Sequence, residues 1–403
     1  MSAAGRPPEV RRGPAWLRRA LRRGVEVFGW TAYAVLTALF PILRIRVGKL
    51  PWERIGEFST RVDLYLRRRA RGDWRGERHV FLPANGSQAN GVLVGIVRRH
   101  VRVLGHPALS AVHDRIKARF PRLWIDLPFD QNEFEEFAEA PPQVRLSAEE
   151  EAAGETLLRA LGIAPGRPFI CFHVRDKRYL DSMHQWRRRE DWAYHDYRDA
   201  DIETYVPAVE HVAARGLFAL RMGYMVEKAL ATTNPRVIDY ASAHRTELGD
   251  VFLMARCKFF LGTNAGMFGV AQMFGVPVAA VNWIPLRFAL LNAHDVFIPK
   301  KLWDVARKRF LTFREIFERG ADDFLTSAEY AAAGIEVVAN TPEEILAVAR
   351  EMNDRLDGRW VAAAEDAGLQ ERYRKLLPPG HHSQGFPSRL GAHFLRENRE
   401  LLD

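Results

Sequence analysis

The sequence predicts an α/β protein built from two lobes, each with a mainly parallel sheet. Short runs rich in β-branched and apolar residues alternate with helical stretches, which is the pattern of folds with parallel sheets. The chain has 403 residues, enough for two domains of ordinary size. Its composition, 47% hydrophobic and 27% charged residues, excludes a wholly disordered chain and a fibrous protein.

The expected elements follow one another in order along the chain. Short apolar segments are expected to be strands: Ile45–Val47, His79–Leu82, Val101–Leu104, Phe169–Val174, Phe218–Met222, Val237–Asp239, Phe259–Leu261, Val278–Val281 and Ile335–Val338. The segments expected to be helices between them include Ile202–Arg215, Glu247–Arg256, Gly266–Phe274 and Pro342–Asp354. The last helix has a clear start, because Thr341 suits the N-cap, Pro342 the first turn and Glu344 the reciprocal cap bond.

The alternation breaks near Ala140–Arg167, where Pro-rich and Gly-rich stretches flank a polar helix. We therefore expect four parts in the chain. They are a basic, apolar segment at 1–43, an N-terminal α/β lobe at 44–160, a C-terminal α/β lobe at 161–345 and a helical tail at 346–403. Open α/β sheets bind ligands beyond the carboxyl ends of their strands, so functional residues are expected there.

Positive charge is concentrated at the N-terminus. Residues 1–80 hold 18 Lys and Arg against 7 Asp and Glu, whereas the rest of the chain holds 41 against 43. This distribution favours an anionic membrane surface as partner over nucleic acid, whose enzymes more often carry a basic groove along their working domains. The run Gly24–Leu43 has 20 residues and one charge, Glu26, which is about the length of a membrane span.

Three interpretations of this apolar run remain open. Arg44, Arg46 and Lys49 follow it directly, so both ends are positive and no orientation is indicated. The favoured interpretation is an amphipathic helix in the plane of the inner membrane, with residues 1–50 contacting its anionic cytoplasmic surface. A single transmembrane span and a helix buried inside the protein are the alternatives.

The cysteines and the acidic residues argue for a reducing compartment and against a metal site. Cys171 and Cys257 lie in apolar runs without CxxC or zinc-ligand spacing, which is typical of buried thiols in a cytoplasmic protein. Asp199 and Asp201 could hold a divalent cation. Asp201 directly precedes the helix at 202–215, however, where Asp is a favoured N-cap. The cap is preferred, and no metal ligand is expected.

The first candidate site lies at the end of the strand at 169–174, in the segment FICFHVRD. Three polar side chains, those of His173, Arg175 and Asp176, end this apolar strand. The planar guanidinium of Arg175 suits a phosphate, and His173 or Asp176 could be the general base for an acceptor hydroxyl. A strand end with an internal Arg–Asp pair is the structural alternative.

A long segment without regular structure is expected at Asp176–Asp199. Loops of this length are usually functional or disordered, and disordered loops are poor in aromatic residues. This one contains Tyr179, Trp186 and Tyr197. We therefore expect an ordered acceptor-binding loop or lid, whose aromatic faces suit sugar rings or a lipid surface.

The second candidate site is the turn that follows the strand at 259–261. A buried strand, a small-residue turn and a helix N-terminus make an anion site, but such turns also occur for packing alone. The residues concerned are Gly262, Thr263, Asn264 and Gly266. Asn282 ends the next strand and could floor a nucleobase pocket or only close the strand.

These segments resemble a bacterial glycosyltransferase family. The motifs that carry the resemblance are the HVRD strand end, the helix start RDADIETY, the strand end RMG and the loop FFLGTNAG, over about 160–285. Residues 237–281 are also similar to the donor half of heptosyltransferases, and HVR to the arginine motif of fucosyltransferases. The chain departs from heptosyltransferases at Asn264, Ala265 and Gly269, which argues against heptose as the sugar.

The resemblance implies two Rossmann-like lobes in the GT-B arrangement, with a nucleotide-diphosphate sugar bound mainly by the C-terminal lobe and no catalytic metal or other cofactor. Arg175, Arg221 and the 262–266 turn would then meet the donor diphosphate. The expected activity is sugar transfer to a glycan or lipid-linked acceptor in bacterial surface-polysaccharide synthesis. A non-catalytic nucleotide-sugar or glycan-binding protein and a nucleotide-sugar epimerase or hydrolase are the alternatives.

Overall fold

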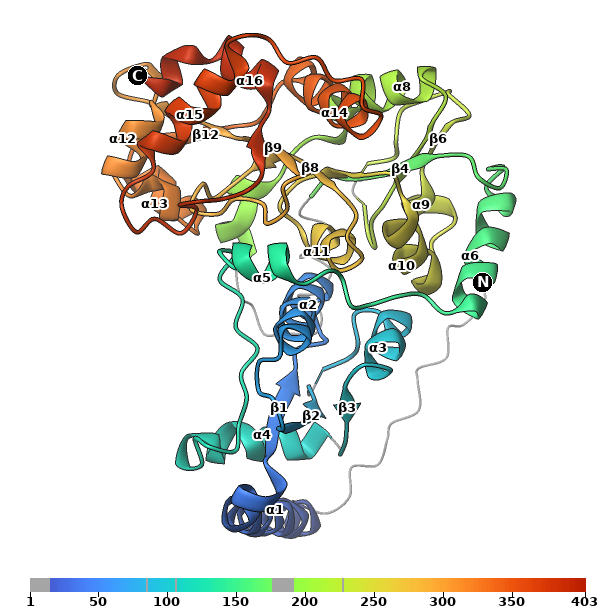
Figure 1. Ribbon diagram of the computed structural model, residues 1–403, viewed down its shortest axis with the longest axis vertical. Helices are drawn as coiled ribbons and strands as arrows, with labels where there is room; N and C mark the ends of the chain where they lie inside the picture. The colour runs from blue at the N-terminus through green and yellow to red at the C-terminus, as the bar shows by residue number, and fades with distance from the viewer. Residues whose placement is uncertain (1–14, 85, 106, 176–191, 227) are drawn as a thin grey trace, which may run out of the picture. The chain divides into compact units, whose positions relative to one another are not determined.

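A computed structural model describes residues 15–403 except 85, 106, 176–191 and 227 (Figure 1). The chain divides into two compact units. The first unit comprises residues 1–51, 74–87 and 101–126, and the second comprises 52–73, 88–100 and 127–403. The expected lobe at 44–160 is therefore not one unit, because its segments 52–73, 88–100 and 127–160 group with the second unit.

The first unit contains a three-stranded parallel sheet in the order β1-β2-β3. Its elements are α1 (Ala15–Leu43), β1 (Ile45–Leu50), β2 (Arg78–Pro83), β3 (Arg102–Val103), α4 (Pro107–Ile116) and the 3-10 helix η1 (Lys117–Arg119). One residue, Arg44, separates α1 from β1. Its positive φ of 47° turns the chain between them.

The second unit is organised around a seven-stranded sheet in the order β13-β9-β8-β7-β4-β5-β6, with all pairs parallel. Its strands are β4 (Phe169–His173), β5 (Phe218–Arg221), β6 (Val237–Ile238), β7 (Phe260–Gly262), β8 (Val278–Trp283), β9 (Val296–Pro299) and β13 (Arg389–Leu390). From β4 the chain adds β5 and β6 on one side, then returns to add β7, β8, β9 and β13 on the other. The strand order therefore reverses between β4 and β7, and such a switch point is where open α/β sheets bind ligands.

Helices surround this sheet, and a second, antiparallel sheet in the order β11-β10-β12 lies outside it (Figure 1). The longer helices are α2 (Ile55–Arg71), α3 (Gly91–Arg98), α6 (Ala148–Ala160), α8 (Val206–Ala214), α10 (Glu247–Arg256), α11 (Gly266–Met273), α14 (Pro342–Leu356) and α15 (Asp366–Leu376). The shorter elements are α5 (Phe134–Glu139), η2 (Trp192–Arg198), η3 (Ile202–Tyr205), α9 (Tyr240–Ala243), β10 (Lys301–Asp304), β11 (Arg309–Phe310), α12 (Phe313–Glu318), η4 (Ala321–Asp323), α13 (Ser327–Ala332), β12 (Ile335–Val338), α16 (Ala392–Glu397) and η5 (Arg399–Leu402).

The expected strands and helices are present, with ends that differ by a few residues. The capping box of Thr341 and Glu344 at the start of α14 is confirmed. Four strands were not expected: β9, β10, β11 and β13. Two strands, the unexpected β13 and the expected β12, change the architecture. The segment 346–403 is not only helical, because β13 extends the main sheet, and β12 belongs to the separate antiparallel sheet.

Helix α2 packs against α11 through small residues, which fixes the first turn of α11 beside the switch point. A Cβ on Gly56 would lie 2.5 Å from the Cα of Gly266, and one on Gly269 would lie 2.7 Å from Ser59 Oγ. The two helices can approach this closely only because these positions lack side chains. Gly266 therefore has a packing role in this structure.

Candidate functional site

The switch point brings the two sequence-predicted sites together. The backbone N–H of Arg175, just beyond β4, donates to Thr263 Oγ1 at 3.2 Å, and the N–H of Thr263 donates to the carbonyl of His173 at 3.4 Å. A Cβ on Gly262 would lie 2.5 Å from that same carbonyl oxygen, so glycine permits the contact. The HVR strand end and the 262–266 turn thus form one continuous edge.

His173 is held by the neighbouring strand end. Its Nδ1 lies 2.9 Å from the carbonyl oxygen of Met222, which follows β5. A carbonyl can only accept, so Nδ1 carries the proton and Nε2 carries the lone pair of the neutral ring. This is the tautomer that a general base requires. Asp176, the other base considered, lies outside the described residues.

Arg175 is 9% exposed, and its guanidinium faces the segment that contains His195 and Asp199. Nη1 donates to the carbonyl of His195 at 3.0 Å and forms an ion pair with the carboxylate of Asp199. Arg175 therefore has a carboxylate partner in Asp199, whereas the alternative of a pair with Asp176 lies outside the described residues. Asp199 is accordingly a partner of Arg175.

Two further cations reach the same edge and were not identified from the sequence. Arg198, at the end of η2, donates through Nη2 to the backbone carbonyl of Asn264. Lys300 directly follows β9, is 4% exposed, and donates through Nζ to the carbonyls of Tyr197 at 3.0 Å and Asp199 at 2.6 Å. We call Arg175, Arg198 and Lys300 the switch-point cations.

Burial, together with the positive charge of Arg175, lowers the pKa values of Arg198 and Lys300. Burial, with Arg175 nearby, lowers the pKa of Arg198 to about 10. Burial lowers the pKa of Lys300 to about 8, with Arg175 lowering it further and Asp199 opposing. His195, between them, has its pKa lowered to about 4 by burial and then by Arg198 and Arg175. An anion bound here would relieve these costs, because it favours the charged forms.

The rest of the 262–266 turn is largely occupied by internal contacts. Asn264 donates from Nδ2 to the carbonyl of Ile284 at 3.1 Å. Ala265 is the N-cap of α11, and within the described part of the chain no side chain caps this helix. The first N–H groups of α11 are therefore a partial positive charge at the switch point.

Tyr197, Arg221 and Asn282 are buried, with partners inside the protein. The ring of Tyr197 packs on Tyr330 with centroids 5.2 Å apart. Nη1 of Arg221 donates to the Lys228 carbonyl at 2.6 Å. These contacts favour packing and strand-closing roles over direct ligand contact. Tyr179 and Trp186 lie outside the described residues.

Asn282 closes its strand through a reciprocal pair. Its Oδ1 accepts from the N–H of Asn340 at 2.7 Å, and its own N–H donates to Asn340 Oδ1. Its φ of 53° turns the chain at the end of β8, and the residue is fully buried. The strand-closing interpretation is therefore the one the contacts support.

The cap interpretation of Asp201 is confirmed. Its Oδ1 accepts from the N–H of Glu203 at 3.2 Å at the start of η3, and its Oδ2 accepts from Lys228 Nζ at 2.9 Å. The bond from Lys228 is the main cause that lowers the pKa of Asp201. Among the described residues no group of three His, Cys, Asp or Glu side chains could hold a metal ion.

Solved structures with a similar chain course can be compared with this geometry. The structural neighbours include heptosyltransferases and a family 9 glycosyltransferase. The glycosyl transferase family 9 from Veillonella parvula is 11% identical with a TM-score of 0.43, over 77% of this chain and 97% of its own. The ADP-heptose lps heptosyltransferase II of E. coli is 13% identical with a TM-score of 0.37, over 59% and 84%.

A third neighbour is the E. coli heptosyltransferase WaaC, solved with ADP, at 11% identity and a TM-score of 0.34, over 64% of this chain and 91% of its own. No family model and no curated protein matches the sequence. The neighbours are of the kind that the motif resemblance predicts.

Proposed function

We propose that this protein is a glycosyltransferase that binds a nucleotide-diphosphate sugar at the switch point between β4 and β7. The observation that carries the proposal is the convergence of Arg175, Arg198 and Lys300 on the strand edge where the order of the sheet reverses. A diphosphate is the group that several buried cations and an uncapped helix N-terminus complement best.

The switch-point cations would act on the leaving group. As the bond between the sugar carbon and the diphosphate oxygen breaks, negative charge grows on the diphosphate, and fixed cations in a buried site stabilise that charge more than water does. Arg175 now bonds to Asp199. Donor binding would place phosphate oxygens against this guanidinium in competition with the carboxylate.

His173 is the proposed general base, in an inverting reaction. Nε2 would take the proton from the acceptor hydroxyl while that oxygen forms the new bond to the sugar carbon. The bond between His173 Nδ1 and the carbonyl of Met222 supports this role, because it orients the ring and fixes the tautomer. We propose that the reaction needs no metal, in keeping with the cap role of Asp201.

The acceptor is proposed to be a glycan or a lipid-linked sugar of bacterial surface-polysaccharide synthesis, used at the cytoplasmic face of the inner membrane. Two features support this setting. Cys171 and Cys257 are free, buried thiols. The helix segment Arg23–Leu43 is long and apolar enough to cross a membrane by length and composition, and basic residues flank it. Peripheral attachment through residues 1–50 is the form we propose.

The test is a donor screen with the full chain. GDP-, UDP-, ADP-, dTDP- and CMP-linked sugars are added with and without EDTA while thermal unfolding is followed. A ligand at 100 times its Kd adds about 2.7 kcal/mol to the free energy of unfolding. We expect one nucleotide to stabilise the protein regardless of EDTA, and its diphosphate to be released in the presence of acceptor.

The other outcomes would contradict parts of the proposal. Stabilisation that requires metal would show that the reaction is not metal-free. Binding without release of the nucleotide, with every acceptor class offered, would indicate a non-catalytic binding protein. Failure of all five nucleotides to shift unfolding would reject the switch point as a donor site.

A further inference from the structure

Helix α1 is part of the core of the first unit. Tyr33 is buried in a cluster with Val47 and Leu82 of the sheet and Val112 of α4. Val25, Leu36 and Phe40 pack on the same cluster, so one face of the helix is covered at helical spacing from residue 25 to residue 40.

Polar and close contacts fix α1 along α4 (Figure 1). The hydroxyl of Tyr33 hydrogen-bonds to His113 Nδ1, and Glu26 forms an ion pair with Arg115. A Cβ on Gly29 would lie 2.4 Å from Val112 Cγ1, so glycine allows the two helices to touch. A helix bound along this length to a folded, partly polar unit cannot also have lipid on all sides. This geometry disfavours a transmembrane span.

The opposite face of α1 is apolar and exposed. Between residues 27 and 43 its large exposed side chains are Val27, Phe28, Trp30, Val35, Leu39 and Ile42, with Val27 at 66% and Ile42 at 79% exposure. The sequence from Val27 to Leu43 contains no charged residue. A row of exposed apolar side chains of this length indicates a binding face.

The fold brings additional cations beside this face, from a segment remote in sequence. The ring of Phe120 packs on Trp30 and Tyr33 of α1, with centroids 5.7 and 5.6 Å apart. Arg119 and Arg122, on either side of Phe120 in the chain, are exposed, and neither forms an ion pair with a described residue. Their charge is therefore available at the border of the apolar row.

We infer that the exposed face of α1 and the cations Arg119 and Arg122 form one composite surface that lies flat on an anionic lipid bilayer. The apolar row would enter the boundary between headgroups and acyl chains, and the cations would meet anionic headgroups. A second copy of the chain is a poorer occupant, since it would bring the same cations together. The inference rests on the proposed peripheral attachment and is independent of sugar transfer.

The experiment measures how the full chain partitions onto vesicles of phosphatidylcholine alone and with 30% phosphatidylglycerol. We expect Arg119→Glu with Arg122→Glu to reduce binding to the anionic vesicles at least about tenfold, since both attractive charges near the surface become repulsive. Arg159→Glu with Lys375→Glu, an equal charge change on exposed positions of the second unit, should leave binding unchanged. Val35→Asp should weaken binding to both vesicles, and Val361→Asp, its exposed counterpart, to neither.

Three results would overturn the inference. The first is an equal loss in the Arg119/Arg122 pair and its control, which would mean that net charge alone acts. The second is retention of the protein on vesicles through high salt and alkaline washing, which indicates a span. The third is a fall in molar mass of Val35→Asp without loss of vesicle binding, which indicates a second copy. Nucleotide-induced stabilisation, measured on each variant, reports the fold and the proposed donor site separately.

Discussion

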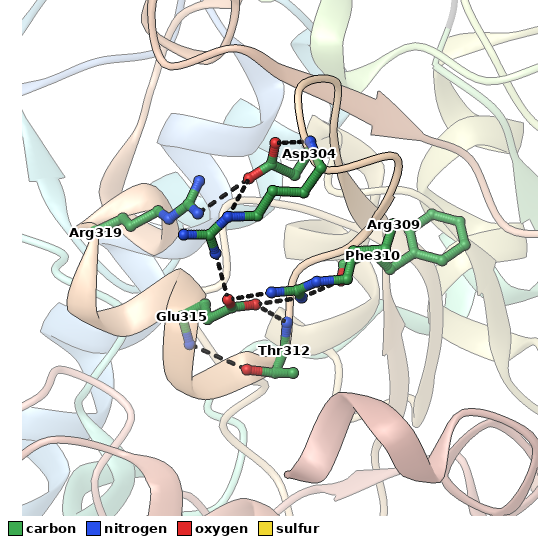
Figure 2. A network of polar contacts seen from close by, with 7 residues as sticks. Asp304, Arg309, Phe310, Thr312, Glu315 and Arg319 are labelled. Carbon is green, nitrogen blue, oxygen red and sulfur yellow. Dashed lines mark hydrogen bonds and ion pairs between the residues drawn. The ribbon is translucent and has the colours of Figure 1, made fainter.

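Two clusters of basic side chains in the second unit show how differently the same residue types can be used. In the first, the antiparallel strands β10 and β11 are joined to α12 by arginines that meet carboxylates (Figure 2). Arg309 donates to the Glu315 carboxylate from both Nη atoms, at 2.7 and 2.6 Å, and Arg307 donates to the same carboxylate at 2.8 Å. Arg319 donates to Asp304 at 3.0 Å. We call this the β10–α12 network.

In the second cluster, the switch-point cations, backbone carbonyls accept many of the bonds. Arg198 donates to the carbonyl of Asn264, and Lys300 to those of Tyr197 and Asp199. A carbonyl dipole satisfies a donor without cancelling its charge. Burial lowers the pKa values of Arg198 and Lys300, whereas the hydrogen bond from Arg309 lowers the pKa of Glu315 to about 2. Each arginine of the β10–α12 network has a carboxylate partner, whereas Asp199 is the one carboxylate described here among the three switch-point cations, so the switch-point cluster is better suited to a further anion.

The largest expected effect is on Arg175. Replacement Arg175→Ala should reduce turnover with the donor identified in the screen by at least about 100-fold, the usual cost of removing one preorganised donor from developing negative charge. Arg175→Lys retains the charge but loses the planar fork, so it should restore only part of the activity. Initial rates of nucleotide release at saturating donor measure both.

The matched control for Arg175 is Arg309→Ala, which removes an arginine from the β10–α12 network. Turnover of this variant should stay within twofold of the unchanged protein. Equal losses in Arg175→Ala and Arg309→Ala would erase the contrast between the two clusters. Far-UV circular dichroism of Arg175→Ala separates lost chemistry from lost folding.

A local sequence pattern predicts an element of secondary structure, but it does not predict which distant residues that element contacts. Phe169–Val174 and Val278–Val281 were predictable because buried parallel strands are continuous apolar runs. The strand β9 is only four residues long and was not predicted. The position of Lys300, which directly follows β9, could therefore not be predicted either. Its importance depends on β9 lying beside β8, which local pattern does not encode.

Glycines illustrate the same limit. The 262–266 turn was predicted to be an anion site, with a packing turn as the alternative. The groups that lie close to its glycines in the structure are the His173 carbonyl and Gly56 of α2. A glycine in a sequence can indicate that another group lies close to the backbone, but it does not indicate whether that group is a phosphate or another part of the backbone. Likewise, residues 52–73 were predicted to belong to the lobe at 44–160, and nothing in their local pattern shows that they group with the second unit.

A smaller effect, about tenfold at pH 7, is expected for Lys300→Met in donor affinity, since a hydrogen bond to a charged group contributes about 1.5–3 kcal/mol. Its pH dependence is more diagnostic. The pKa of Lys300 in the free protein is lowered to about 8, so above that pH the neutral amine must take up a proton to bind an anion. Affinity should therefore fall as pH rises through about 8, by up to about tenfold per pH unit.

Lys300→Arg tests the cause of this pH dependence. Arginine stays charged throughout the range, so the variant should bind the donor with an affinity that is flat between pH 7 and 9.5. Isothermal titration calorimetry in two buffers of different ionisation enthalpy also counts the proton taken up. An unchanged decline in Lys300→Arg would assign the titration to another group.

The smallest effect is expected in the β10–α12 network, where Glu315→Gln should cost about 1 kcal/mol or less of unfolding free energy at pH 7 and no donor affinity. The side chains are partly exposed, and water screens such pairs. Because the folded-state pKa of Glu315 is lowered to about 2 from its usual 4.5, the stabilisation is present above about pH 4.5 and is lost as pH falls toward 2. Urea unfolding of Glu315→Gln and the unchanged protein should therefore differ at pH 7 and converge near pH 2.5. A Glu315→Gln variant that loses donor affinity would show that this network supports the site as well as the fold, and the contrast between the two clusters would fail.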